Sequence, residues 1–266
     1  MEKNILIAVV VIIVLGGAIA AYFYWQHAQP TSEPVYMEVP PPALPSKPVV
    51  QQVIEVPPAW PKLPNLSESD NLILGTLNDL LHNKASMLLF YNEQIIHNIV
   101  ATIDNLPCRR MPISVMLVKQ VHGQFITENS ENDKTISPQN TARYSAYVRI
   151  FEGIDTQKLV EVYLRLYPLF QQAYEELGYP KKYFNDRLLA VLDGLLAAPD
   201  LKEPIKLIQP NVFYLYADPD LEARSAGQKI LMRMGSENES KIKAKLREIK
   251  QQVMLRMHDK KVNSTE

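Results

Sequence analysis

The strongest constraint in the sequence is an uncharged apolar run of twenty residues, Ile5 to Tyr24. A helix rises 1.5 Å per residue, so a run of this length spans about 30 Å, the thickness of the hydrocarbon core of a bilayer. Aromatic side chains occupy positions 22–25, where amphipathic rings favour the membrane interface. The run therefore predicts a single transmembrane anchor over residues 5–25, preceded by a short cytoplasmic N-terminus, residues 1–4.

A cleaved signal peptide is the alternative interpretation of this run. Ala18-Ile19-Ala20 provides a small-residue cleavage site, but the apolar run continues past it and Lys3 is the only basic residue before it. No Lys or Arg follows the run until Lys47, so the positive-inside rule places the N-terminus in the cytoplasm. Either interpretation exports the rest of the chain.

A proline-rich stalk is expected next, over residues 26–65. Eleven prolines and no glycine lie between Pro30 and Pro64. Proline fixes φ and removes a backbone donor, so the segment favours extended polyproline II structure over helix or sheet. We expect a semi-rigid spacer.

The remaining sequence predicts one compact, mostly α-helical domain over residues 66–258, with at most a short β hairpin, and a disordered tail over 259–266. Apolar residues recur at helical spacing, with caps and glycine stops at the expected ends. A small hairpin, or alternatively two extended packing segments, is expected around Gln209-Pro210-Asn211, and Thr127 to Lys134 is expected to be a loop. The first helix is expected to start near Ser67, and further helices are expected over residues 85–105, 138–151, 155–177, 182–197, 218–234 and 236–258.

The charge distribution argues against one class of partner. The net charge is −1, which disfavours nucleic-acid binding. Residues 241–261 nevertheless carry eight basic and two acidic side chains, whereas residues 65–240 carry seventeen basic and twenty-two acidic ones. The basic final helix is either packed on the acidic body or a surface for anionic lipid or an acidic partner; its apolar stripe, Ile242, Leu246 and Ile249, favours packing.

No catalytic, metal or cofactor motif is present. The sequence has no H-E-x-x-H, G-x-S-x-G, Walker or G-x-G-x-x-G pattern, and its five histidines are scattered. We therefore predict no catalytic residues, no metal and no cofactor. The acidic residues from which a glycosidase-like carboxylate pair would have to come are Glu175, Glu176, Asp186, Asp193 and Asp218.

Several motifs are more specific than helical periodicity. They are YPLFQQAYEELGYP (167–180), YFNDRL (183–188), ADPDLE (217–222), AGQK (226–229), RMG (233–235), DNLP (104–107) and Arg143-Tyr144. In these the chain resembles domain-of-unknown-function family 3014, a group of proteobacterial proteins with one N-terminal anchor and a proline-rich linker. The resemblance covers most of residues 66–247 and implies an inner-membrane protein facing the periplasm, with no established activity. Residues 109–137 match little of the pattern, and no role is assigned to them.

The hypothesis is a non-enzymatic binding or scaffold module of the cell envelope, with an envelope protein or the cell wall as partner. The alternative is an envelope hydrolase that acts on peptidoglycan or another polymer through a carboxylate pair. The candidate contact surface consists of motif residues that helix packing does not require: Arg143, Tyr147, Glu176, Tyr179, Asp186, Arg187, Asp218 and Gln228. For each of them, an internal ion pair or helix cap is the competing explanation.

Overall fold

A computed structural model describes residues 62–81, 90–112, 116, 119, 121, 123–130, 133–202 and 204–263. The predicted anchor (5–25) and nearly all of the predicted stalk (26–65) lie outside this part of the chain. Among the described helices, none combines the length and the apolar character needed to cross a bilayer.

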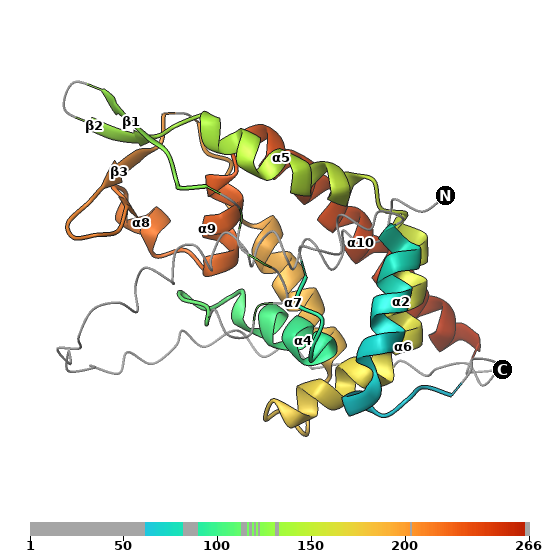
Figure 1. Cartoon of the computed structure of the whole chain (residues 1–266). Helices are drawn as coiled ribbons and strands as arrows, with labels where there is room; N and C mark the ends of the chain where they lie inside the picture. The colour runs from blue at the N-terminus through green and yellow to red at the C-terminus, as the bar shows by residue number, and fades with distance from the viewer. Residues whose placement is uncertain are drawn as a thin grey trace.

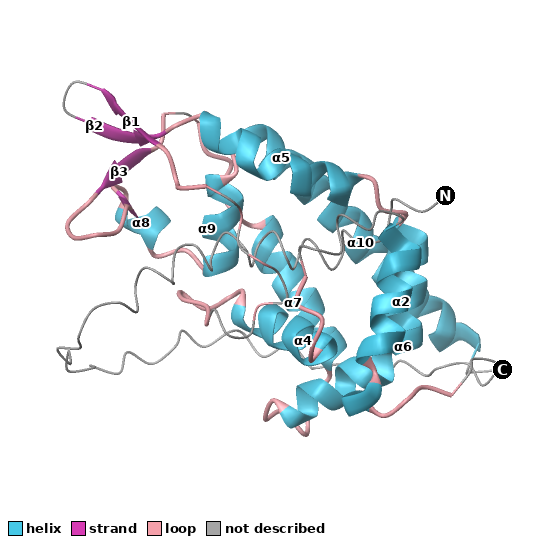
Figure 2. Cartoon of the chain, in the orientation of Figure 1, coloured by secondary structure: helices cyan, strands magenta, loops and turns pink. Residues whose placement is uncertain are grey.

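The described chain is mostly helical, as predicted, with a small sheet at one end (Figures 1 and 2). The helices are η1 (Leu66–Glu68), α2 (Asp70–Leu81), α4 (Ile95–Asn105), α5 (Gln139–Glu152), α6 (Thr156–Glu176), α7 (Phe184–Leu196), α8 (Pro219–Glu222), α9 (Ala226–Arg233) and α10 (Ser236–Asn263). The strands are β1 (Thr127–Ser130), β2 (Asp133–Ile136), β3 (Lys206–Ile208) and β4 (Leu215–Tyr216).

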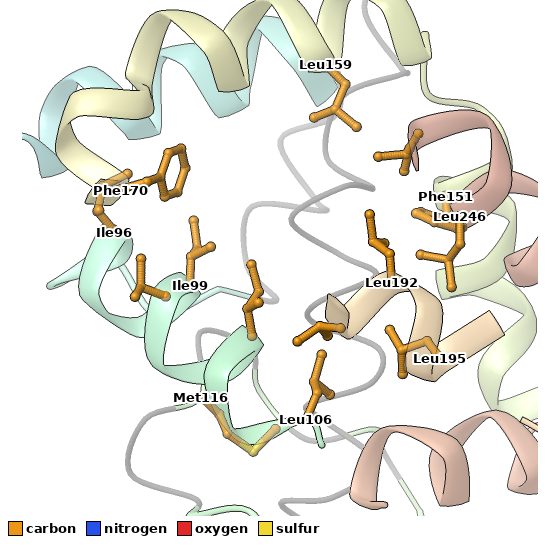
Figure 3. Close-up of a cluster of buried hydrophobic side chains, with 14 of the residues drawn as sticks. Ile96, Ile99, Leu106, Met116, Phe151, Leu159, Phe170, Leu192, Leu195 and Leu246 are labelled. Carbon is orange, nitrogen blue, oxygen red and sulfur yellow. The ribbon is translucent and has the colours of Figure 1, made fainter. Parts of the chain in front are cut away.

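Helix α10 lies at the centre of the packing and contacts α5, α6, α7 and α9. Its apolar stripe is buried: Ile242 and Leu246 are each 1 % exposed and Ile249 is 9 % exposed. Helix α4 packs against α2, α6 and α7, which closes the other side of the main core. In Figure 3, Ile99 of α4, Leu159 and Phe170 of α6, Leu192 of α7 and Leu246 of α10 point toward this shared interior.

Helix α6 confirms the local end signals in the sequence. The Asp155 carboxylate accepts hydrogen bonds from the backbone N–H groups of Gln157 and Lys158, at 3.0 and 3.1 Å. Gly178 follows the helix with φ +113°, in the left-handed region that glycine enters without a Cβ clash. Pro168 lies inside the helix, which continues to Glu176.

The sheet is larger than the predicted hairpin. Its four strands are antiparallel in the order β1-β2-β3-β4. The hairpin β3–β4 agrees with the predicted one, whereas β1 and the first half of β2 were predicted as a loop because residues 127–134 are polar. That prediction was wrong because β2 pairs with β3, from a distant part of the sequence, and Lys134 aligns with Leu207 in this ladder.

Three predicted helices have different bounds. The last one, expected over 236–258, continues as α10 to Asn263, within the stretch predicted to be a disordered tail (259–266). The helix expected over 85–105 begins at Ile95, and Gln94 before it has φ +52°; residues 82–89 lie outside the description. The helix expected over 218–234 divides into α8 and α9. The Ser225 hydroxyl accepts from the Gln228 N–H and thereby caps a new helix.

Candidate partner-binding surface

The carboxylate of Asp104 joins three segments of the domain. It lies in the last turn of α4, and its side chain is 12 % exposed. Nε of Arg187, on α7, donates to Asp104 Oδ1 at 2.7 Å, and the Tyr179 hydroxyl donates to Oδ2 at 3.2 Å. Arg187 also donates to the backbone carbonyl oxygen of Asp104 at 2.6 Å. The charge of Asp104 is therefore compensated within the protein.

The turn after α6 brings Tyr179 to this cluster. Its ring stacks on Tyr174 with centroids 4.6 Å apart, and Lys182 Nζ lies 4.9 Å from its centroid. The negative charge of Asp104 is the main reason that the pKa of Tyr179 lies above its usual value. The tyrosine thus remains a neutral hydrogen-bond donor at neutral pH.

An exposed pair, His97 and Glu176, links α4 to the end of α6. His97 Nε2 lies 2.8 Å from Glu176 Oε2, and the two side chains are 38 % and 48 % exposed. The hydrogen bond with His97, supported by one from Gln172, holds the pKa of Glu176 below its usual value. Glu176 therefore presents a carboxylate at the surface around neutral pH.

Asp186 adds a second carboxylate, in the first turn of α7. Its side chain makes no hydrogen bond or ion pair within the described part of the chain, and partial burial raises its pKa. Burial is the main reason that the pKa values of Tyr163 and Tyr174 are raised, and the negative charge of Asp186 adds to it. An incompletely compensated, half-buried carboxylate is a favourable contact for a cationic or hydrogen-bond-donating partner.

The structure thus gathers four of the eight candidates, Glu176, Tyr179, Asp186 and Arg187, where α4, the end of α6 and the start of α7 meet. We call these four, with His97 and Asp104, the α4–α6–α7 junction. Sequence reasoning left out His97 and Asp104, although Asp104 begins the DNLP motif. The missing information was the pairing between distant segments.

The other four candidates lie elsewhere and have structural roles. Tyr147 is 6 % exposed and belongs to the main core. Arg143 donates to Asn140 Oδ1 and to the Gly123 carbonyl oxygen. Gln228 Nε2 donates to the Gly194 carbonyl oxygen at 2.7 Å. Asp218 caps α8 by accepting from the Asp220 N–H at 2.8 Å.

Most of the carboxylates proposed for a hydrolase bind separate partners within the domain. Glu175 accepts from Gln171 Nε2 at 2.8 Å, and Asp193 pairs with Lys250 on α10. Glu176 pairs with His97 and Asp218 caps α8, as described above. Within the described residues, no three His, Cys, Asp or Glu side chains are grouped so as to hold a metal ion.

Several basic side chains of α10 form ion pairs within the domain. Lys243 Nζ lies 2.6 Å from Asp200 Oδ1 and 2.8 Å from Glu239 Oε1. Lys250 pairs with Asp193 of α7, and Arg256 approaches Glu161 of α6 at 3.5 Å. The opposite charges of the body and the final helix therefore hold α10 in place, in agreement with the packed-helix interpretation.

Comparison with known proteins gives one match. The model of a family described as "Protein of unknown function (DUF3014)" matches residues 95–250, which include α4, α10 up to Lys250 and everything between them. No curated protein and no solved structure matches.

Proposed function

The chain belongs to the DUF3014 family, and on that premise we propose that it is a binding module of the cell envelope that recognises a protein partner through the α4–α6–α7 junction. The observation that carries this proposal is the clustering of Glu176, Tyr179, Asp186 and Arg187 at α4, where Tyr179 and Arg187 bind Asp104, which lies 75 and 83 residues earlier in the chain. The four residues are close in sequence, and the contacts with Asp104 join them to α4. Tyr179 and Arg187 bind Asp104 and thereby hold the turn after α6 and the start of α7 against α4, while Glu176 and Asp186 present carboxylates.

In the junction, stacked rings and partly buried hydrogen bonds fix the backbone, and two carboxylates remain at least partly exposed, so that a partner can contact them. The stacked pair Tyr174–Tyr179 and the bonds to Asp104 position the turn after α6. Such preorganisation reduces the conformational entropy that the junction itself would lose when a partner binds. The two carboxylates favour a partner that presents Lys or Arg side chains.

The proposed setting is the periplasmic face of the inner membrane. Its support is the apolar run Ile5–Tyr24, the prolines that follow it and the absence of Lys and Arg until Lys47. A C-terminal alkaline phosphatase fusion tests it, since this enzyme is active only after export. Activity in the membrane fraction, and its loss when residues 5–25 are deleted, is the expected result; an inactive fusion would reject the proposed orientation.

In-cell crosslinking of the tagged full chain tests the binding function. A photoreactive amino acid at Leu177, which follows Glu176 and is exposed, is expected to capture a stoichiometric partner, identified by mass spectrometry. The matched control places it at Glu152, which is also exposed but lies at the C-terminal end of α5.

Charge reversal sharpens this experiment. Glu176→Arg should abolish recovery of the partner, whereas Glu152→Arg should leave it unchanged. Equal capture from both positions, or no partner from either, would reject the junction as the binding surface. Hydrolysis of isolated cell wall by the full chain would instead favour an enzyme.

A further inference from the structure

An apolar cavity of about 110 Å³ lies between α2, α4, α6, α7 and α10. Each helix contributes aliphatic side chains to it, among them Leu77, Ile99, Leu166, Leu188 and Ile249. The lining, all from described residues, contains no charged side chain. The carboxylates discussed above therefore take no part in it.

The two hydroxyl groups in the lining are already engaged. Thr76 Oγ1 donates to the carbonyl oxygen of Leu72 at 2.8 Å, within α2. The Tyr163 hydroxyl donates to Asn185 Oδ1 at 3.1 Å. The cavity thus offers few polar partners to a water molecule, which needs two to four of them.

Aromatic packing keeps one wall of the cavity in place. Phe170 stacks on Phe184 with centroids 5.7 Å apart and an interplanar angle of 11°. Tyr163 packs against Phe170 at 5.6 Å. These three rings join α6 to α7 and oppose collapse of the space between the helices.

We propose that this cavity binds a single unbranched hydrocarbon chain, such as the end of a fatty-acyl chain. The occupant must be apolar because the lining leaves it no free donor or acceptor. Its size is limited, since an engineered apolar cavity of about 150 Å³ accepts benzene. This inference does not depend on the proposed partner surface, because none of the α4–α6–α7 junction side chains lines the cavity.

Photolabelling of the full chain in an amphipathic polymer tests the proposal. The probe is a fatty acid with a diazirine near the end of its chain, and labelled peptides from residues 62–263 are identified by mass spectrometry. The expected labels lie on the helices that line the cavity, α2, α4, α6, α7 and α10. Linear alcohols should compete, and their potency should rise about fourfold per added methylene until the chain exceeds the cavity.

Variants identify the cavity as the site. Leu77→Phe replaces an aliphatic side chain of the lining with a larger phenyl ring, which fills part of the cavity and should abolish labelling. The matched control is Leu207→Phe, since Leu207 is 5 % exposed but belongs to the separate cluster beneath the sheet. If circular dichroism shows that Leu77→Phe is unfolded, Val160→Leu makes the same test with one added methylene.

Two outcomes would overturn the proposal: labelling that is unchanged in a folded filling variant, and competition that does not depend on alcohol chain length. The same diazirine chain carried by a phosphatidylcholine in vesicles distinguishes the source. Labelling by both probes supports a membrane-lipid chain, and labelling by the fatty acid alone supports a free fatty acid.

Discussion

Arg187 binds Asp104 twice: Nε donates to the carboxylate at 2.7 Å, and a terminal nitrogen donates to the backbone carbonyl oxygen of the same residue at 2.6 Å. The fork of donors on a guanidinium allows this double contact, which an ammonium group cannot reproduce in the same geometry. It joins α7 to the last turn of α4, and the Asp104 side chain is only 12 % exposed.

Asp104→Ala should therefore lower the free energy of unfolding by about 2–4 kcal/mol, because Arg187 and Tyr179 lose their acceptor in a largely buried site. Arg187→Lys should lose part of this amount. Urea unfolding is the measurement, with Arg256→Ala as control. Arg256 approaches Glu161 at 3.5 Å with both side chains about half exposed, so its removal should change stability by less than about 1 kcal/mol.

Asp70 caps a helix other than its own. Its two carboxylate oxygens accept from the backbone N–H groups of Gln94 and Ile95, at 2.7 and 2.8 Å. Asp70→Ala should lower the free energy of unfolding by about 1–2 kcal/mol, because the start of α4 loses its cap. Asp79→Ala, at an exposed site on the same helix, is the control. Equal effects in the two variants would contradict the capping role.

Gly227 lies where α9 meets α7 and the end of α4. A Cβ there would come within 2.5 Å of Leu195 Cδ2 and 3.3 Å of the Leu106 carbonyl oxygen. Gly227→Ala should lower the free energy of unfolding by about 1–3 kcal/mol through overpacking. Gly75→Ala, in α2 with nothing within 4 Å of the new Cβ, should instead raise it by about 0.5–1 kcal/mol. Thermal unfolding of both variants shows directly whether each substitution lowers or raises the stability.

Lys243 and Glu239 form a buried ion pair on α10, with side chains 3 % and 2 % exposed. Burial raises the pKa of Glu239, and the ion pair with Lys243 opposes that rise. Lys243→Met should lower the free energy of unfolding by about 3–5 kcal/mol at pH 7, because Glu239 is left buried without its cation. The double variant Lys243→Met/Glu239→Leu should recover most of that loss.

The pH dependence of the Lys243→Met variant follows from the same burial. Without Lys243, the pKa of Glu239 in the folded state rises further above its value in the unfolded state. The folded state then binds the proton more tightly, so the stability of the variant should increase as pH falls from 7 toward about 4.3, the ordinary pKa of glutamate. Urea unfolding at pH 7, 6 and 5 measures this; a loss that stays constant relative to the wild-type protein would contradict it.

Sequence reasoning was most accurate where the structure depends on neighbouring residues. Asp155 and Gly178 delimit α6 as predicted, because a cap and a left-handed stop act within one turn of the helix end. Asp218 starts α8 for the same reason. The burial of Ile242, Leu246 and Ile249 followed from helical spacing alone.

The candidate site was only partly predictable. Four of its motif residues were selected as polar side chains that helix packing does not require, and Glu176, Tyr179, Asp186 and Arg187 do lie together. Their common hub, Asp104, was not selected, because its role depends on Arg187, which is distant in sequence. Tyr147 was selected as a surface residue, yet most of its area is buried in the core.

By itself, then, the sequence determined the helical class, the ends of the locally capped helices and their apolar faces, because these depend on contacts within a few residues. The tertiary structure alone decided that polar residues 127–130 and 133–136 form strands, since β2 is completed by its ladder with β3. It likewise decided that Asp70 caps α4 and that Asp104 joins Tyr179 to Arg187. Each of these contacts joins groups that are far apart in the chain and meet only after the helices have packed.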